Sequence, residues 1–482
     1  MLVNPVFNVL IAAAEKWPDK IAVYDELGEQ TFLELYTEAE KLRTKLLAAD
    51  IHEGMAVGVM AKNGRNFITG IFAVIGTGAV AMPMSHQLKS HEITEATEGA
   101  KLSAVIDDAT SKDFSPVNPH VIELTNGFFR LSRLIKTAVD NQPFAPHVQN
   151  PAFMRFTSGT TGKAKGVIIS HQSALERTAA ANKVLQLGEN DTVLWVLPMA
   201  YHFVVSILLY VRYGAAIAIA QDFLPLNVIQ LANKSNATLL YASPMQIRLL
   251  ANTESELKMP TLKRAISTSA GISAEICKQF QSRYNLPVSQ AYGIIEIGLP
   301  MINTFNNSDH PEAVGHVLPD FEVRLFNDHF EPVQPGEAGK LGIKGPGMFD
   351  AYLDPPLLRE EVTVDGFFLT ADFATVSPDG LVTIQGREKS VMNIAGNKVF
   401  PEEVEGVLES YPGVKTARII SVPHPLMGQI IQAELIPDHS TQVDVEELIS
   451  YCRKKLSTYK VPQRVAFVDK LPMTPSGKLV RY

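Results

Sequence analysis

Up to about residue 300, short apolar runs rich in β-branched residues alternate with longer stretches of helical periodicity. Each run is continuous and does not alternate with polar residues, which is typical of strands that helices cover on both faces. The pattern therefore predicts parallel α/β layers. The runs that we interpret as strands are 56–60, 104–107, 152–156, 192–197, 215–220, 237–242, 264–267 and 288–292.

The start of one helix can be predicted from its capping residues. Thr31 and Glu34 have the spacing of a capping box, in which the two side chains satisfy free N–H groups at a helix N-terminus. Leu35, Leu42 and Leu46 then fall on one helical face. We therefore predict an amphipathic helix that begins after Thr31.

The longest apolar run covers about residues 68–84, and it contains three glycines and Pro83. A transmembrane helix needs about 20 consecutive apolar residues, so this run falls short of a clean bilayer span. The run predicts a buried helix that continues into a strand. We therefore expect no membrane span.

After about residue 315 the pattern changes to short strands separated by turns such as Gln334-Pro-Gly336 and Asp379-Gly380. This texture indicates a small β-rich unit over about 315–385. The remaining residues predict two helices and two strands, at 402–410, 414–422, 433–436 and 445–456. The expected fold class is α/β, with a large N-terminal domain of α/β layered subdomains (to about 314) plus the β-rich unit, followed by a small α+β C-terminal domain.

Composition and charge narrow the possible partners. The 482 residues carry a formal net charge of −8 and contain no block of Lys and Arg, so neither a nucleic acid nor an anionic membrane surface is indicated. The only cysteines, Cys277 and Cys452, lie far apart without metal-type spacing. A disulfide framework and a structural zinc site are therefore not expected, and the low cysteine content fits a cytoplasmic protein.

The strongest local signal is the segment Phe156-Thr-Ser-Gly-Thr-Thr-Gly-Lys-Ala-Lys-Gly166, which lies between two apolar runs. Its glycines allow close backbone approach to a ligand, and its hydroxyls, Lys163 and Lys165 suit a polyphosphate. The spacing is not that of a Walker A loop. A flexible surface turn rich in small residues is the alternative.

This segment closely resembles the phosphate-binding loop of the adenylate-forming superfamily, which includes acyl- and aryl-CoA ligases, luciferases and peptide-synthetase adenylation domains. Ala164 stands where the family usually has Pro. The resemblance extends over nearly the whole chain, with the later motifs in the family's order. It implies that Lys165 is catalytic and that the loop residues bind nucleotide, namely Thr157, Ser158, Gly159, Thr160, Thr161, Gly162 and Lys163.

The segment Ala291-Tyr-Gly-Ile-Ile-Glu296 is similar to the family segment whose Tyr packs on adenine and whose Glu helps to hold Mg²⁺. The resemblance implies nucleotide binding by Ala291, Tyr292 and Gly293, and a catalytic, metal-binding Glu296. Ile295 stands where the family usually has Thr, so one phosphate hydrogen bond of about 0.5–1.5 kcal/mol is missing or replaced. A buried strand end with a satisfied Glu is the alternative.

Three further segments resemble nucleotide-contacting motifs of the family. Ser269-Ala270-Gly271 stands where the family has a small-residue turn, although a packing glycine explains it equally well. Thr370-Ala-Asp372 resembles the Thr-Gly-Asp segment, whose Asp binds both ribose hydroxyls, with an exposed turn Asp as the alternative. Gly386-Arg387-Glu-Lys389 resembles the interdomain hinge, where Arg387 would contact ribose or phosphate and Lys389 would be the pivot.

The hinge implies a division into residues 1–386 and a mobile domain over 387–482, with the hinge near 386–390. Within the second part, Gly396 matches the glycine that opens the family's pantetheine tunnel, and Pro475-Ser-Gly-Lys478 resembles the segment that carries the mobile catalytic lysine. A solvated surface charge is the alternative for Lys478.

The apolar segment 197–209 occupies the family's acid-binding region, and His202 resembles its catalytic gate histidine, with one additional residue after Pro198. Phe203, Val204 and Val205 argue against an amino acid and suit a fatty or aromatic acid. The same spacing also fits a core helix.

Together the motifs imply an AMP-forming acid–thiol ligase with ATP, Mg²⁺ and coenzyme A as cofactors. It would activate a carboxylic acid to acyl-AMP with release of pyrophosphate, and then form a thioester with coenzyme A. One alternative is transfer to the phosphopantetheine thiol of an acyl carrier protein. A second alternative, suggested by Ile295 and Ala371, is a nucleotide-binding homologue with impaired catalysis.

Overall fold

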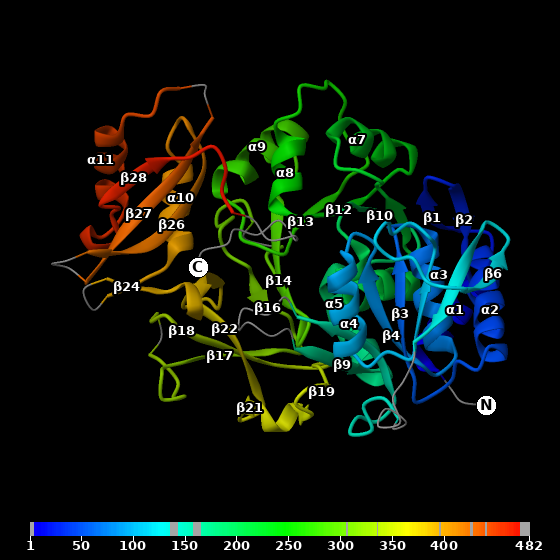
Figure 1. Cartoon of the computed structure of the whole chain (residues 1–482). Coiled ribbons are helices and arrows are strands. Elements are labelled where there is room, and N and C mark those ends of the chain that lie inside the picture. Colours follow the sequence, from blue (N-terminus) through cyan, green and yellow to red (C-terminus); the bar gives the residue numbers. More distant parts are fainter. Residues whose placement is uncertain are drawn as a thin grey trace.

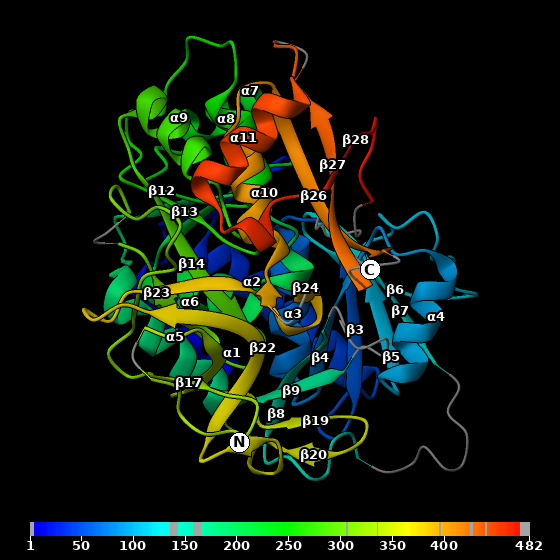
Figure 2. The same ribbon diagram turned by 90° about the vertical axis from the view of Figure 1, so that its left-hand side faces the viewer.

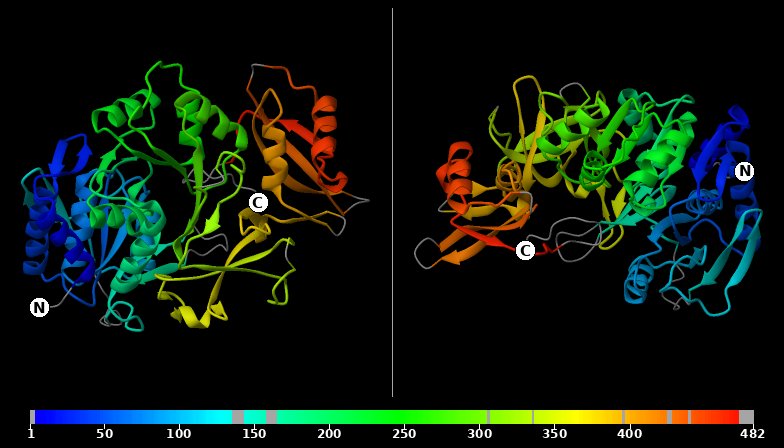
Figure 3. Two further views of the ribbon diagram at one scale, coloured as in Figure 1. Left: turned by 180° about the vertical axis from the view of Figure 1, so that it is seen from behind. Right: turned by 90° about the horizontal axis from the view of Figure 1, so that it is seen from above.

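The computed structural model describes residues 4–134, 143–157, 165–304, 307–334, 336–394, 397–424, 428–438 and 441–472. Within these residues, the N-terminal elements, the central elements and the C-terminal domain follow one another across the molecule (Figures 1 and 3).

Two nine-stranded sheets organise the described residues of the large N-terminal part (Figure 1). In the first sheet six neighbouring strands are parallel, namely β14, β13, β12, β10, β11 and β1. The strands β2, β15 and β16 pair antiparallel at the two edges. Its spatial order is β16 (His316–Val317), β15 (Gly298–Ile302), β14 (Val288–Ile294), β13 (Arg264–Ser267), β12 (Leu239–Ala242), β10 (Thr192–Trp195), β11 (Ala216–Ile219), β1 (Ile21–Asp25) and β2 (Gly28–Thr31).

The second sheet is parallel only at its centre, where β8, β4, β3 and β5 are neighbours. Antiparallel strands flank this centre on both sides. Its spatial order is β20 (Leu357–Leu358), β19 (Ala351–Tyr352), β9 (Gly166–Ser170), β8 (Pro151–Phe156), β4 (Val80–Ser85), β3 (Ala56–Ala61), β5 (Ala104–Asp107), β7 (Gly127–Arg133) and β6 (His120–Leu124).

Helices cover these sheets, and buried side chains from both sheets contribute to one continuous hydrophobic core. Burial of apolar surface from two sheets and their helices is the main stabilising term for such a layered fold. The helices are α1 (Pro5–Lys16), α2 (Phe32–Ala48), α3 (Arg65–Gly76), α4 (Ser90–Gly99), α5 (His171–Leu185), α6 (Leu208–Tyr213), α7 (Pro225–Lys234), α8 (Pro244–Ala251) and α9 (Ala274–Tyr284).

The predicted α/β fold class is confirmed, and each of the eight apolar runs overlaps a strand. The run at 68–84 is a buried helix, α3, followed by strand β4, as predicted. The antiparallel edge strands β2 and β6 were not predicted, because they are short and partly polar. Among the described residues, every helix is too short or too polar to cross a membrane.

The capping box of α2 is present. The Thr31 N–H donates to Glu34 Oε2 over 2.8 Å, and the Glu34 N–H donates to Thr31 Oγ1 over 3.2 Å. Leu35, Leu42 and Leu46 are fully buried on the inner face of the helix. The helix therefore begins where its two capping side chains replace the missing intrahelical partners.

Replacing Thr31 by alanine is expected to lower the free energy of unfolding by about 1 kcal/mol, because the cap acceptor is lost. Urea denaturation followed by circular dichroism measures this change. Thr37→Ala is the matched control, since Thr37 is exposed within α2 and, among the residues that the structure describes, its Oγ1 bonds only the Leu33 carbonyl oxygen. Equal unfolding midpoints for the two variants would contradict the prediction.

The β-rich unit packs beside the two large sheets (Figure 2). The antiparallel hairpin of β22 and β23 is its longest feature, and it ends at Arg387. Its strands are β17 (Glu322–Phe326), β18 (Gly339–Lys344), β21 (Thr363–Val364), β22 (Phe367–Val376) and β23 (Val382–Arg387).

The C-terminal residues form a small α+β domain with a separate hydrophobic core, made only of side chains between Met392 and Val461. This separate core supports the domain boundary that we propose near 386–390. The elements are β24 (Met392–Ile394), β25 (Asn397–Val399), α10 (Pro401–Glu409), β26 (Val414–His424), β27 (Gly428–Pro437), α11 (Val445–Lys455) and β28 (Arg464–Phe467). The domain lies beside α8 and α9 (Figure 1).

Candidate active site

The two ends of the predicted phosphate-binding loop are held together. The Thr157 N–H donates to the Lys165 carbonyl oxygen over 2.9 Å, and the Lys165 N–H donates to Thr157 Oγ1 over 3.2 Å. These bonds continue the antiparallel pairing of β8 with β9, so the loop connects two adjacent strands. Eight predicted site residues lie outside the described residues: Ser158, Gly159, Thr160, Thr161, Gly162, Lys163, Gly396 and Lys478.

Lys165 and Glu296 lie on either side of Tyr352. The Lys165 ammonium is 4.6 Å from the centre of the Tyr352 ring, and the Tyr352 hydroxyl donates to Glu296 Oε1 over 3.2 Å. Tyr352 reaches this position because β19 pairs with β9, directly after the loop. The structure therefore brings the loop and the candidate metal ligand together through a residue that no sequence motif marked.

The Glu296 side chain is buried, with 9% of the residue exposed. Burial raises the pKa of its carboxyl group, and the hydrogen bond from Tyr352 and the charges of Arg155 and Lys165 act in the opposite direction. The Glu296 carbonyl oxygen also accepts the Phe349 N–H over 2.7 Å. A buried carboxylate with a shifted pKa and a specific hydrogen-bond partner is common at functional sites.

Arg155 connects this carboxylate to the predicted acid-binding segment. Its charge interacts with Glu296, and its Nη1 donates to the Tyr201 carbonyl oxygen, directly before His202. The His202 ring packs edge-on against Trp195, with ring centres 5.5 Å apart. His202 therefore directly follows the residue whose carbonyl oxygen Arg155 bonds.

The segment after His202 forms a π-helix over Phe203–Ile207, which runs into α6. Such turns are rare and often occur at functional sites. The Phe203 ring is fully buried between Phe72 and Phe153, at 5.5 Å and 5.9 Å. The core-packing interpretation of this segment is therefore correct for Phe203, while Val205 stays partly exposed.

Tyr292, Asp372 and Arg387 form a second cluster at the end of β14. The Tyr292 hydroxyl donates to Asp372 Oδ2 over 2.5 Å, and Arg387 Nε lies 3.2 Å from Asp372 Oδ1. Burial, followed by the charge of Asp372, raises the pKa of Tyr292. Asp372 is only 3% exposed, so the alternative of an exposed turn Asp is wrong.

Arg387 reaches Asp372 because the two residues are cross-strand partners in the β22–β23 hairpin. Ala371, directly before Asp372, has a φ of 61°, a left-handed conformation in which a side chain costs roughly 1 kcal/mol or more. This conformation explains why a glycine suits the position. Lys389 follows in a short 3₁₀ turn, Glu388–Ser390, at the start of the C-terminal domain.

The small residues among the predicted nucleotide contacts differ in how deeply they are buried. A side chain at Gly293 would lie 2.4 Å from the Gly298 carbonyl oxygen, so the tight β14–β15 turn requires glycine there. Ala291 is buried, next to Tyr292 in β14. Ser269, Ala270 and Gly271 are exposed and follow β13, the parallel neighbour of β14. They therefore lie at the same edge of the sheet as Tyr292.

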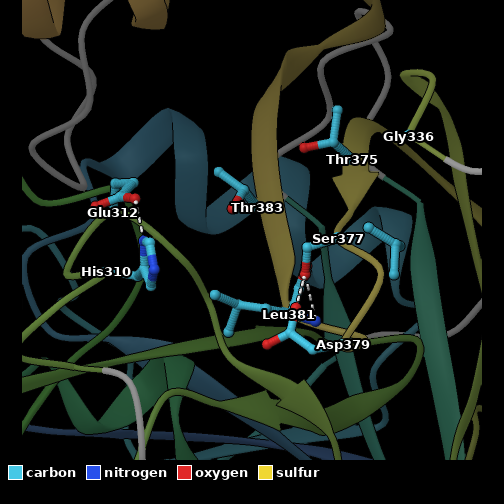
Figure 4. A pocket seen from close by; sticks show the side chains of 9 residues that line it. His310, Glu312, Gly336, Thr375, Ser377, Asp379, Leu381 and Thr383 are labelled. Atoms are coloured by element: carbon cyan, nitrogen blue, oxygen red, sulfur yellow. Dashed lines mark hydrogen bonds and ion pairs between the residues drawn. The ribbon is translucent and has the colours of Figure 1, made fainter.

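A recess of about 330 Å³ lies at the opposite end of the β22–β23 hairpin (Figure 4). In it, His310 contacts Glu312 over 3.3 Å and Ser377 donates to Asp379, and all four side chains are at least partly exposed. None of the predicted site residues that the structure describes lines this recess. The candidate active site is therefore the arrangement around Glu296 and Asp372.

Comparison with known protein families gives two matches that together cover most of the chain. A family model described as "AMP-binding enzyme" matches residues 10–353, and one described as "AMP-binding enzyme C-terminal domain" matches residues 403–478. The second match ends at Lys478, the predicted catalytic lysine.

Three similar proteins illustrate the relationship. Feruloyl-CoA synthase of Amycolatopsis sp. is 27% identical over 94% of this chain and 92% of that protein. 2-Succinylbenzoate–CoA ligase of Geobacillus sp. (strain WCH70) is 26% identical over 98% of this chain and 96% of that protein. The solved structure of amide bond synthetase McbA from Marinactinospora thermotolerans has the same fold, with a TM-score of 0.85, 21% identity and 98% coverage of both chains.

Proposed function

The chain belongs to the family of AMP-binding enzymes, and from this premise we propose that it activates a carboxylic acid with an apolar body to acyl-AMP and then forms a thioester with coenzyme A. It is an AMP-forming acid–thiol ligase, and ligases of this type use ATP, Mg²⁺ and coenzyme A. The nature of the acid, the acceptor thiol and the roles of individual residues are our proposals. The observation that carries them is the convergence of Lys165, Glu296 and the Tyr292–Asp372–Arg387 cluster around the end of β14.

The residues present fit a magnesium ion. Mg²⁺ prefers hard oxygen ligands and is usually held by one or two carboxylates together with substrate phosphates. Glu296 offers one buried carboxylate that accepts the Tyr352 hydroxyl, and the Tyr352 ring lies beside Lys165 at the end of the phosphate-binding loop. We propose that Glu296 holds the ion. When bound, Mg²⁺ neutralises negative charge on the phosphates.

In the first half-reaction the acid's carboxylate attacks the α-phosphorus of ATP and pyrophosphate leaves. Negative charge builds on phosphate oxygens, so catalysis requires mainly positioning and cationic stabilisation. Asp372 would accept hydrogen bonds from the ribose hydroxyls, and Arg387 would contact ribose or phosphate. Lys165 and Lys478 would supply positive charge near the phosphates.

In the second half-reaction the thiol attacks the acyl carbonyl and AMP leaves. We propose that the C-terminal domain turns about Lys389 between the two half-reactions, so that Lys478 and the segment of Gly396 serve one reaction each. The separate core of the domain supports such a rigid-body rotation.

The acid is proposed to be fatty or aromatic. Val205, which follows the core residue Phe203, is apolar and partly exposed, and no acidic side chain follows His202 within that segment to hold an ammonium group. The relatives include proteins named feruloyl-CoA synthase, 2-succinylbenzoate–CoA ligase and long-chain-fatty-acid–CoA ligase. A binding pocket lined by apolar side chains would favour such an acid.

Acid-dependent exchange of labelled pyrophosphate into ATP tests the proposal. A panel should include aliphatic acids of increasing length, hydroxycinnamates and amino acids. Exchange with an apolar acid, followed by thioester formation on coenzyme A, is the expected result. Product only on a holo acyl carrier protein would assign the other thiol, and no exchange with any acid would favour a homologue with impaired catalysis.

Arg248 of α8 connects the large domain to the C-terminal domain in the relative orientation that the two domains have in this structure. Its Nη1 donates to the Lys415 carbonyl oxygen over 2.7 Å, and its Nη2 lies 3.6 Å from Glu409 Oε2. The other Glu409 oxygen accepts the Ala417 N–H over 3.1 Å, which fixes the carboxylate. This contact stabilises one of the two orientations that the mechanism requires.

Replacing Arg248 by alanine is expected to slow one half-reaction about three- to tenfold and leave the other unchanged, because a partly exposed ion pair and its hydrogen bond contribute about 1 kcal/mol. Pyrophosphate exchange and single-turnover thioester formation measure the two rates separately. Arg283→Ala is the control, since Arg283 of α9 bonds carbonyl oxygens at Ser255 and Leu257 within the large domain. Equal slowing of both half-reactions would refute an orientation effect.

A further inference from the structure

Arg177 is an almost completely buried arginine in α5, with 1% of the residue exposed. Burying a charge is costly unless hydrogen bonds and opposite charges compensate for it. Burial lowers the pKa of Arg177 to about 10, and Asp350 and Glu296 oppose this change. The guanidinium is therefore still charged at neutral pH. Apolar packing does not explain why a charged side chain is buried at this position.

The two donors of Arg177 hold two separate backbone segments. Its Nε donates to the Gly347 carbonyl oxygen over 2.7 Å, and its Nη1 donates to the Ile295 carbonyl oxygen over 3.0 Å. Ile295 directly precedes Glu296 in the turn between β14 and β15. Arg177 thus holds the peptide group that joins Ile295 to Glu296.

The second segment that Arg177 holds, around Gly347, also contacts the Glu296 backbone. The Gly347 N–H donates to Glu176 Oε2 over 3.1 Å, and the Phe349 N–H donates to the Glu296 carbonyl oxygen over 2.7 Å. Gly347 has a φ of 65°, and a side chain there would lie 2.4 Å from the Arg177 backbone nitrogen. The segment therefore lies directly against α5 and connects Arg177 to both sides of Glu296.

The third nitrogen of the guanidinium, Nη2, is buried and has no hydrogen-bond partner among the described residues. The oxygens of the nearby Asp350 are used elsewhere: Oδ1 accepts the Ser170 and Ser173 hydroxyls over 3.1 Å, and Oδ2 accepts the Ser170 N–H over 2.6 Å. Arg177 is therefore not the direct ion-pair partner of Asp350. Its bonds to the carbonyl oxygens of Ile295 and Gly347, on either side of Glu296, remain as the reason for its position.

We propose that Arg177 is a positioning residue that fixes the Glu296 backbone, and so aims the carboxylate at the metal ion of the nucleotide site. The inference rests on the proposed function, in which Glu296 holds Mg²⁺. It also gives a role to the turn at Ile295, which lacks a side-chain hydroxyl: its side chain packs against the core, and its carbonyl oxygen is the group that Arg177 holds.

The test uses the full-length enzyme with Arg177→Met, which removes the donors but keeps an unbranched apolar stem, and Arg177→Lys, which keeps the charge. The first readout is the affinity for ATP by calorimetry, with and without Mg²⁺. The second is the Mg²⁺ concentration that half-saturates pyrophosphate exchange. Residues that support a metal ligand typically contribute 10- to 100-fold, so we expect R177M to need about tenfold more Mg²⁺.

With R177M, Mg²⁺ should also increase the affinity for ATP less than it does in the unaltered enzyme. R177K should lie between the two proteins. Arg212→Met is the matched control, because Arg212 of α6 bonds the Leu175 carbonyl oxygen over 2.6 Å and Thr178 Oγ1 over 2.8 Å, on the same helix α5. R212M should keep the Mg²⁺ dependence of the unaltered enzyme even if its thermal midpoint falls.

An unchanged Mg²⁺ dependence in R177M would overturn the inference, provided that the unaltered enzyme shows acid-dependent exchange. If the unaltered enzyme shows no exchange, the proposed function itself fails, and the two failures are thus distinguishable. Should R177M not fold, R177K gives the decision: a Mg²⁺ dependence equal to that of R212M would overturn the inference.

Discussion

Replacing Asp372 by asparagine is expected to lower kcat/KM for ATP by about two orders of magnitude and to leave KM for the acid unchanged. Asp372 is buried between Tyr292 and Arg387, and its carboxylate would accept both ribose hydroxyls. Hydrogen bonds to a charged group contribute about 1.5–3 kcal/mol each, and the neutral amide weakens two of them. A loss of about 3 kcal/mol corresponds to roughly 100-fold in rate.

Initial rates of pyrophosphate exchange at varied ATP measure the effect. Asp379→Asn is the control on the same hairpin, because Asp379 lies in the exposed β22–β23 turn and pairs only with Ser377 and His316 among the described contacts. This variant should behave like the unaltered enzyme. An Asp372→Asn enzyme with unaltered kcat/KM for ATP would remove Asp372 from the nucleotide site.

Replacing Glu296 by glutamine is expected to lower activity about 100- to 1000-fold and at the same time to raise the thermal midpoint of the ligand-free protein. The loss follows because one charged metal ligand disappears. The gain follows from the pKa of Glu296, which burial raises. A buried carboxyl that must ionise destabilises the folded state, and glutamine removes that cost.

The sign of the pH dependence follows from proton linkage. A carboxyl group with a raised pKa binds its proton more tightly in the folded protein than in the unfolded chain. Its contribution to the free energy of unfolding is therefore fully present below the pKa of the unfolded chain, and it is lost as pH rises through the pKa of the folded protein. Glu296→Gln should therefore stabilise the protein at pH 8 and make little difference at about pH 4. Mg²⁺ with ATP should stabilise the unaltered enzyme more than the variant.

Thermal melting across this pH range, with and without Mg²⁺ and ATP, measures both effects. Glu322→Gln on the exposed edge of β17 controls for the change in net charge. A Glu296→Gln protein that melts at a lower temperature than the unaltered enzyme at pH 8 would contradict the buried-charge argument. Full activity in that variant would contradict the proposed metal site.

The layered part of the fold could be predicted from the sequence because its central strands are continuous apolar runs. The predicted boundaries of β5 (Ala104–Asp107) and β13 (Arg264–Ser267) agree with the structure residue for residue. The antiparallel edge strands β2 and β6 could not be predicted, since their polar and exposed residues resemble loops. Their pairing depends on neighbouring strands rather than on a local apolar pattern.

The candidate site could be predicted where its residues belong to local motifs. Glu296, Asp372 and Arg387 each lie in a short recognisable segment, and the structure places them on adjoining elements. Arg177 and Tyr352 could not be predicted, because each is a single residue without a surrounding pattern. Their contacts join positions that are 118 and 56 residues apart in sequence, which only the folded chain brings together.

The pairing of β23 with β22 has a consequence for the order of events during turnover. Arg387 ends β23 and is held beside Asp372 by the strand pairing, whereas the proposed pivot, Lys389, lies two residues further along the chain. Rotation at the pivot leaves this ladder intact. The nucleotide should therefore keep its contacts with Asp372 and Arg387 while the smaller domain changes orientation.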